Sequence, residues 1–176
     1  YSGLTYDNNE YVSCGSFWEH AERTLVIQSC SKNFGMTGWR VGFVFAPEEI
    51  TKKLITIQGQ SITGTSIISQ WAAVAALKES KKITTEINQE MNRRRDIFTQ
   101  TFNENFPGAN LKAPASAFYS FIPLKSFGTW HDDDVKFCEQ VLAEGNVAMV
   151  PGSAFGKPGY VRASFGAQPR ELQEAV

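Results

Sequence analysis

Gln28-Ser-Cys-Ser-Lys-Asn-Phe-Gly-Met-Thr-Gly-Trp-Arg-Val-Gly42 is the stretch on which the interpretation of this chain depends. It is polar and rich in glycine, and it joins two short apolar runs, 23–28 and 41–46, that predict buried β-strands. If the lysine in this loop is buried, it must be neutral, paired or covalently bonded, because an isolated ammonium is costly to remove from water. Lys32 is therefore a candidate functional residue.

A second cation follows in the same loop. Arg40 lies eight residues after Lys32, a separation of up to roughly 26 Å in an extended chain. Gly35 and Gly38 allow turns that bring the two side chains to one pocket. Together with the hydroxyl of Ser29, they suit a ligand with a carbonyl group at one end and a phosphate at the other. The residues alone leave a plainer alternative open, a surface loop with a solvated lysine and an arginine paired to a carboxylate.

The composition is that of a packed globular protein. Of the 176 residues, 42% are hydrophobic and 20% are charged, which argues against a disordered, collagen-like or coiled-coil chain. The 17 basic and 18 acidic residues nearly cancel, so we expect no nucleic-acid partner and no membrane partner. The three widely spaced cysteines favour a reducing compartment, and we expect a cytoplasmic protein.

The apolar pattern predicts a mixed α/β fold. Helices are expected at 48–59, 67–77, 83–102, 132–145 and from Pro169 onward, and further strands at 117–124, 147–150 and 160–165. The helix at 67–77 is apolar enough to predict burial on most sides. Long helices give way to short strands near residue 80, which predicts one domain over 1–80 and a smaller one over 81–176.

Two charged clusters have a structural explanation. His131-Asp-Asp-Asp134 could suggest a metal site, but three acids at a helix start are better explained by capping and by the helix dipole, so we expect no metal. Arg93-Arg-Arg95 is interpreted as a solvated helix face.

Ser29-x-Ser-Lys32-x-x-x-Met36-Thr-Gly-Trp-Arg40-x-Gly42 resembles the cofactor-lysine signature of fold-type I, pyridoxal-phosphate-dependent aminotransferases of classes I and II. The similarity extends along the whole chain, in order. The other segments that resemble the family are 1–6, 60–73, 150–155 and 161–165. The resemblance implies the C-terminal part of a PLP-dependent transferase fold. Residues 1–80 would end the large cofactor-binding domain, and 81–176 would form a small α+β domain truncated at its C-terminus.

The resemblance also implies roles for five residues. Lys32 would form the internal Schiff base with pyridoxal 5'-phosphate and then, once freed, carry a proton between the substrate Cα and the cofactor. Arg40 and Ser29 would bind the phosphate, and Tyr1 would hydrogen-bond the phenolic oxygen. Arg162 would grip the substrate α-carboxylate. From its sequence context alone, Arg162 is better explained as a strand arginine paired at the surface.

The implied function is an aspartate aminotransferase-like transfer of an amino group between an amino acid and a 2-oxo acid, in a full-length homodimer. Ser116 departs from the glycine that the family usually has there, which bears on the substrate class. Family members carry a carboxylate for the pyridine nitrogen before the segment that Tyr1 begins, so we expect a fragment that is inactive in isolation. The alternatives are a lyase, decarboxylase or cyclopropane-forming synthase of the same fold, or a non-catalytic aminotransferase-like domain of a transcriptional regulator.

Overall fold

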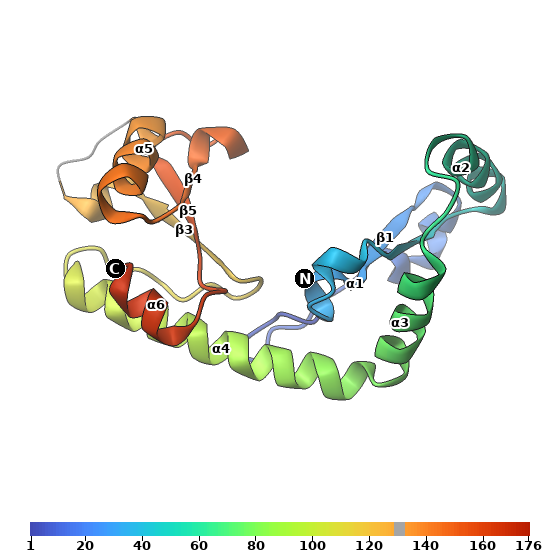
Figure 1. The fold of residues 1–176 in the computed structure, drawn as a ribbon, viewed down its shortest axis with the longest axis horizontal. Coiled ribbons are helices and arrows are strands. Elements are labelled where there is room, and N and C mark those ends of the chain that lie inside the picture. The colour runs from blue at the N-terminus through green and yellow to red at the C-terminus, as the bar shows by residue number, and fades with distance from the viewer. Residues whose placement is uncertain (129–132) are drawn as a thin grey trace. The chain divides into compact units, whose positions relative to one another are not determined.

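The computed structural model describes residues 1–128 and 133–176, and it divides into two units, Tyr1–Asn88 and Gln89–Val176. The long helix α4 (Ser80–Asn105) contains the point of division. The boundary predicted between residues 80 and 81 lies beside the first residue of that helix. The expected mixed α/β class is confirmed, because helices and small antiparallel sheets alternate along the chain (Figure 1).

The first unit contains one two-stranded sheet and, besides the start of α4, three α-helices, of which the first is a single turn. Its elements are η1 (Cys14–Ser16), η2 (Trp18–Arg23), β1 (Val26–Ser29), α1 (Cys30–Asn33), η3 (Thr37–Trp39), β2 (Gly42–Phe45), α2 (Glu48–Ser61) and α3 (Ile67–Lys78). β1 and β2 pair antiparallel, with Val26 opposite Phe45 and Ser29 opposite Gly42. A Cβ on Gly42 would lie 2.6 Å from the Gln28 carbonyl oxygen, so only glycine fits this close approach.

The prediction of two buried strands is wrong for the described chain. Ile27 is 74% exposed and Phe45 is 60% exposed, because a two-stranded sheet leaves much of its surface uncovered. The prediction that α3 is buried on most sides is also wrong, since its large side chains are exposed, among them Ile68 and Trp71. The helix packs through small residues instead. Those that are buried are Ser69, Ala73 and Ala76.

The second unit is built on a three-stranded antiparallel sheet in the order β3-β5-β4 (Figure 1). After α4, its elements are β3 (Tyr119–Pro123), η4 (Leu124–Phe127), α5 (Asp134–Gly145), β4 (Val150–Pro151), η5 (Gly152–Phe155), β5 (Tyr160–Ser164) and α6 (Pro169–Glu174). The strand predicted at 147–150 is only two residues long in the structure, Val150–Pro151, and shares only Val150 with the predicted range. The central strand β5 has Arg162 opposite both Phe121 and Val150.

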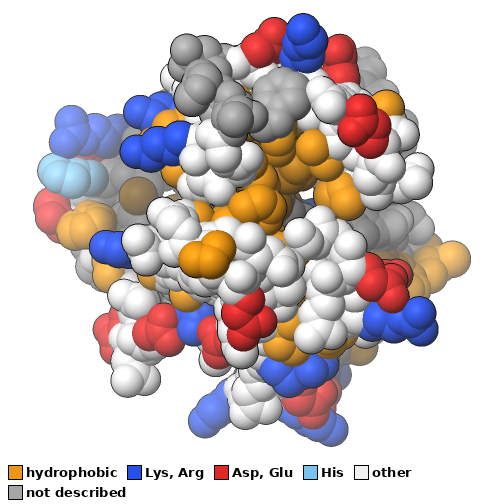
Figure 2. All heavy atoms as spheres, turned by 90° about the vertical axis from the view of Figure 1, so that its left-hand side faces the viewer, with side chains coloured by type: hydrophobic (Ala, Val, Ile, Leu, Met, Phe, Trp, Pro, Cys, Tyr) orange, Lys and Arg blue, Asp and Glu red, His pale blue; other side chains and the backbone are white. Residues whose placement is uncertain are grey.

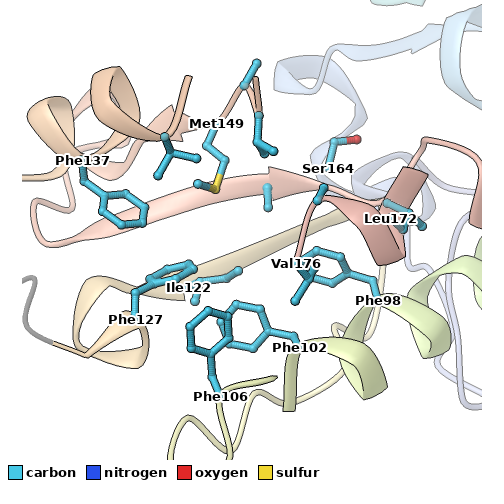
Figure 3. Close-up of a pocket in the computed structure, with 15 residues that line it drawn as sticks. Phe98, Phe102, Phe106, Ile122, Phe127, Phe137, Met149, Ser164, Leu172 and Val176 are labelled. Carbon is cyan, nitrogen blue, oxygen red and sulfur yellow. The ribbon is translucent and has the colours of Figure 1, made fainter. Parts of the chain in front are cut away.

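An aromatic core holds the second unit together. Phe102 of α4 lies 4.8 Å from Phe106 and 5.3 Å from Phe127, measured between ring centroids. Phe127 in turn lies 4.8 Å from Phe137 of α5. These rings line a largely apolar cavity of about 310 Å³. Figure 3 shows them gathered around it. On the face seen in Figure 2, hydrophobic side chains surround a hollow and charged side chains lie mostly around them.

Two charged residues of this unit are more buried than sequence patterning suggests. The interpretation of the arginine run as a solvated face is wrong for Arg95, which is only 4% exposed. Its guanidinium donates to Asp96 at 2.9 Å and to the Pro114 carbonyl at 3.3 Å, so partners satisfy the buried charge. Asp134, in the first turn of α5, is also 4% exposed.

The acidic start of α5 serves as a helix cap. The Asp133 carboxylate accepts a hydrogen bond from the Lys136 amide at 2.9 Å, as expected for an N-cap residue. His131 and Asp132 lie outside the described residues. Within residues 1–128 and 133–176, no group of three metal-ligating side chains comes together. No helix in those ranges is long and apolar enough to cross a membrane.

Candidate functional site

The signature loop is folded back on itself between β1 and β2. Ser29 ends β1 and caps α1, and its hydroxyl oxygen accepts a hydrogen bond from the Ser31 amide at 3.1 Å. Gly35 adopts φ +63°, which reverses the chain after α1 at little steric cost. The Cys30 amide then donates to the Val41 carbonyl at 3.2 Å. Both ends of the loop are therefore held together, and Arg40 returns to the neighbourhood of α1.

This fold brings three of the signature side chains to one cavity. Ser29, Ser31 and Arg40 line a cavity of about 310 Å³, together with backbone and side-chain atoms of β1 and β2. Lys32 lies one residue beyond Ser31, half-buried in the single turn of α1, and is not among the described residues that line this cavity. Arg40 therefore returns to the loop as expected, and Lys32 directly follows a residue that lines this cavity without lining it itself.

Arg40 is held in an unusual backbone conformation. It has φ +51° and ψ +51° in the left-handed region, which costs a residue other than glycine about 1–3 kcal/mol. One guanidinium nitrogen, Nη1, donates to the Thr37 carbonyl at 3.1 Å. A guanidinium carries five N–H donors, so donors remain for a ligand in the cavity.

The first residues of the chain are tied to the helix that carries Lys32. The Asn33 side chain accepts from the Gly3 amide at 3.1 Å and donates to the Ser2 hydroxyl at 2.8 Å. The Tyr1 carbonyl accepts from the Leu4 amide at 2.8 Å, which turns the segment so that Tyr1 belongs to the same local structure. The Tyr1 side chain is 45% exposed.

Two asparagines that hold this segment were not identified from the sequence. Asn33 is the first, and Asn88 is the second, because its amide nitrogen donates to the carbonyls of Gly3 and Thr5, both at 2.9 Å. A signal for Asn33 existed, since it directly follows Lys32 and can both donate and accept. Asn88 carried no such signal, because 83 residues separate it from Thr5.

A buried thiol lies beneath the loop. Cys30 is 1% exposed and packs in the core of the first unit with Met36 and Val41. Burial raises the pKa of the Cys30 thiol, because a thiolate would lose its hydration. The thiol therefore stays neutral, and Cys30 acts as a small apolar residue on the buried side of α1.

The predicted carboxylate-binding arginine lies in the second unit, on the strand β5. The Arg162 guanidinium carbon lies 4.3 Å from the centroid of the Tyr119 ring and 4.7 Å from that of Phe155. The side chain is half-buried. In the part of the chain that the structure describes, no carboxylate forms an ion pair with it.

Comparison with known proteins gives a consistent family. The whole chain, residues 1–176, matches the family described as aminotransferase class I and II. It is 34% identical over 179 residues to a probable aspartate/prephenate aminotransferase of Aquifex aeolicus and 38% identical over 180 residues to an aspartate aminotransferase of Pyrococcus abyssi. Both matches include 100% of this chain and 45% of the relative.

Solved structures agree with this result. An aromatic aminotransferase from Pyrococcus horikoshii aligns with a TM-score of 0.89 and 38% identity, over 99% of this chain and 46% of that one. An aspartate aminotransferase from Rhizobium meliloti aligns with a TM-score of 0.88 and 32% identity, over 99% and 46% of the two chains. The chain thus spans about 45% of the length of the curated relatives it matches. Their fold is also the fold of this chain, which belongs to the class I and II aminotransferase family.

Proposed function

We propose that the whole protein is a pyridoxal-phosphate-dependent aminotransferase that moves an amino group between an amino acid and a 2-oxo acid. The observation that supports this most directly is the cavity lined by Ser29, Ser31 and Arg40, because Ser31 directly precedes Lys32. The chain that contains it belongs to this family. The names of the relatives, aspartate, aspartate/prephenate and aromatic aminotransferases, favour an acidic or aromatic substrate.

The residues around the cavity have the chemistry that a phosphate monoester requires. Arg40 offers a planar, permanently charged donor, the best side-chain match for phosphate oxygens. The Ser29 oxygen already accepts the Ser31 amide, which leaves its O–H group to donate to an anion. Arg40 also keeps a strained backbone at this place, as residues at binding sites commonly do. The cavity therefore fits the phosphate group of the cofactor.

Lys32 is proposed as the residue that bonds to the cofactor and later moves the proton. Pyridoxal phosphate supplies an aldehyde carbon for attachment and a ring that takes up electrons from the substrate Cα. Once the substrate amino group had taken the place of Lys32, the freed Lys32 amine would be a base next to the reacting carbon. It would accept the proton from the substrate Cα and deliver it to the cofactor carbon on the other side of the shared nitrogen. Water would then release the 2-oxo acid and leave the amino group on the cofactor, and the reverse sequence with a second 2-oxo acid would complete the transfer.

Tyr1 and Arg162 are proposed to orient the reactants. Tyr1 would donate its phenolic O–H to the cofactor's phenolic oxygen, and the bonds of Asn33 to Ser2 and Gly3 hold its segment beside α1. Arg162 would bind the substrate α-carboxylate through two parallel N–H donors. A fixed carboxylate in turn fixes the direction of the Cα–H bond, which aids proton removal.

We further propose how the chain contributes to the whole protein. The unit that contains Lys32 would belong to the large cofactor-binding domain, and the unit that contains Arg162 to the small domain. The whole protein would act as a homodimer in the cytoplasm. Because the relatives are about twice as long as this chain, we expect the 176-residue chain on its own to lack amino-transfer activity and to bind the cofactor weakly or not at all.

Trapping of the lysine–cofactor bond tests the proposal. The whole protein is incubated with pyridoxal phosphate, reduced with borohydride and digested, and mass spectrometry locates the attached cofactor. We expect attachment at Lys32 and its loss in Lys32→Ala, with transfer to several 2-oxo acids reduced by at least about 1,000-fold. Attachment at another lysine, or transfer that persists in Lys32→Ala, would contradict the assignment.

The same preparation separates the alternative functions. A lyase of this fold would release ammonia or a fragment of the side chain, and a decarboxylase would release carbon dioxide, in each case without making a new amino acid from the 2-oxo acid. Cofactor attachment with none of these reactions would favour the non-catalytic regulator.

A further inference from the structure

One face of the sheet in the second unit is aromatic, and Arg162 lies in it. Side chains alternate between the two faces of a strand, and residues opposite each other share a face. Val161 and Ala163 point into the core, where they are buried. Arg162 therefore lies on the other face with its partner Phe121.

The Arg162 guanidinium is in contact with the flat faces of two rings. Its central carbon lies 4.3 Å from the Tyr119 centroid and 4.7 Å from the Phe155 centroid, well within the distance for cation–π attraction. Rings over a guanidinium cover its flat surface, whereas its N–H donors lie in its plane. Such contacts restrict the rotation of the side chain and leave the donor edge available to a carboxylate.

Phe155 is itself held firmly. It ends η5, a turn that begins at Gly152, where a Cβ would clash with the Lys157 carbonyl oxygen. The buried Asp134 carboxylate accepts a hydrogen bond from the Ser153 amide at 2.5 Å, which ties this turn to α5. The Phe155 ring also meets Phe121 edge-on at 6.2 Å. The turn therefore places Phe155 against Arg162.

We propose that Tyr119 and Phe155 are positioning residues for Arg162, which hold its guanidinium plane ready for bidentate binding of the substrate carboxylate. This inference rests on the proposed role of Arg162. The two rings act through the arginine and not on the substrate. By restricting a side chain with several rotatable bonds before the substrate arrives, they lower the entropy that is lost on binding.

The test uses the whole protein loaded with pyridoxal phosphate and compares Tyr119→Leu and Phe155→Leu with the unaltered protein. KM for the amino acid and Kd for succinate, a dicarboxylate with no amino group to transfer, are measured together with kcat. Loss of one cation–π contact should raise both KM and Kd about threefold to fivefold and change kcat less than about twofold.

Two further variants separate positioning from a general structural role. Tyr119→Phe keeps a flat ring, so its KM and Kd should stay within about twofold of those of the unaltered protein. Tyr160→Leu removes a ring that stacks on Phe121 at 5.1 Å, and it should also leave both constants within about twofold. Since Phe155 is 49% exposed, its replacement removes little of the core.

The outcomes distinguish this inference from the proposed function. If Arg162→Ala raises KM and Kd strongly but both leucine variants leave them unchanged, the positioning role is overturned and the carboxylate-binding role stands. The same conclusion follows if Tyr160→Leu has as large an effect as the other two. If Arg162→Ala changes neither constant, the proposed role of Arg162 fails, and the positioning role fails with it.

Discussion

The two units of the chain are stabilised in different ways. The buried residues of the first unit include small ones such as Cys30, Ala73 and Ala76, and many of its large apolar side chains are exposed. The second unit buries large side chains, with Phe102 and Phe165 at 2% exposure or less. The comparison teaches that an aromatic core supports the sheet whose opposite face carries Arg162, whereas hydrogen bonds and backbone turns shape the signature loop of the first unit.

The largest expected effect concerns the aromatic core. Phe102→Ala should lower the free energy of unfolding by about 3–5 kcal/mol, because a buried ring is lost and a cavity already lies beside it. Trp71→Ala in the first unit is the matched variant, since it removes a larger ring that is 68% exposed, and it should change stability by less than about 0.5 kcal/mol. Denaturant unfolding measures both. If both variants lose the same unfolding free energy, the two units do not differ in how their large side chains contribute to stability.

The next effect separates binding from stability in the first unit. Arg40→Gly removes the guanidinium and relieves the left-handed backbone, so stability should change by less than about 1 kcal/mol. Affinity for pyridoxal phosphate should fall about tenfold to a hundredfold, because a charge-assisted hydrogen bond is lost. Absorbance titration of the whole protein measures the affinity. Unchanged affinity would show that the phosphate binds elsewhere.

A smaller effect is expected at the segment that carries Tyr1. Asn33→Ala removes the bonds to Ser2 and Gly3 and should cost about 1–3 kcal/mol of local stability. Hydrogen exchange should accelerate at the Gly3 amide, which loses its acceptor, while the Phe165 amide of the second unit keeps its rate. Equal exchange rates at Gly3 in both proteins would contradict the proposed tie.

The smallest effect is a pH dependence in the second unit. Hydrogen bonds from Arg93 and then Arg94 lower the pKa of Glu90 from 4.5 to about 2. A carboxyl group whose pKa is lower in the folded state than in the unfolded state stabilises the fold at pH values above its unfolded-state pKa. This stabilisation is lost as the pH falls through its folded-state pKa. Compared with Glu90→Gln, the unaltered protein should therefore lose its advantage in unfolding free energy between about pH 4.5 and pH 2. The unfolding free energies of both proteins are measured as a function of pH. If the two curves stay parallel across that range, Glu90 is not a source of the pH dependence.

Much of the fold was predictable because it depends on local patterns. The helix predicted at 48–59 forms as Glu48–Ser61, since two acids after Pro47 favour a helix start and apolar residues continue at helical spacing. The short α5 begins at an acidic cap and ends beside Gly145, as expected. The signature around Lys32 predicted the family because its hydroxyls, lysine, glycines and arginine occur at specific spacings.

Tertiary contacts decided which side of each element is covered. Arg95 belongs to a run that reads as solvated, yet the Pro114 carbonyl and Asp96 satisfy its charge and allow burial. Ile68 belongs to an apolar stripe that reads as buried, yet α3 packs through its small residues. A sequence pattern records which side chains are apolar or charged, but not which neighbours reach them.

The sequence by itself determined the family, the elements and the candidate residues Lys32, Arg40 and Arg162, because spacing and residue type are local properties of the chain. Only the tertiary structure showed that Arg40 and Ser29 line one cavity, which Lys32 does not line, and that Tyr119 and Phe155 contact Arg162. The reason is physical: these relations join residues that are distant in sequence, and backbone turns and core packing set the distances between them.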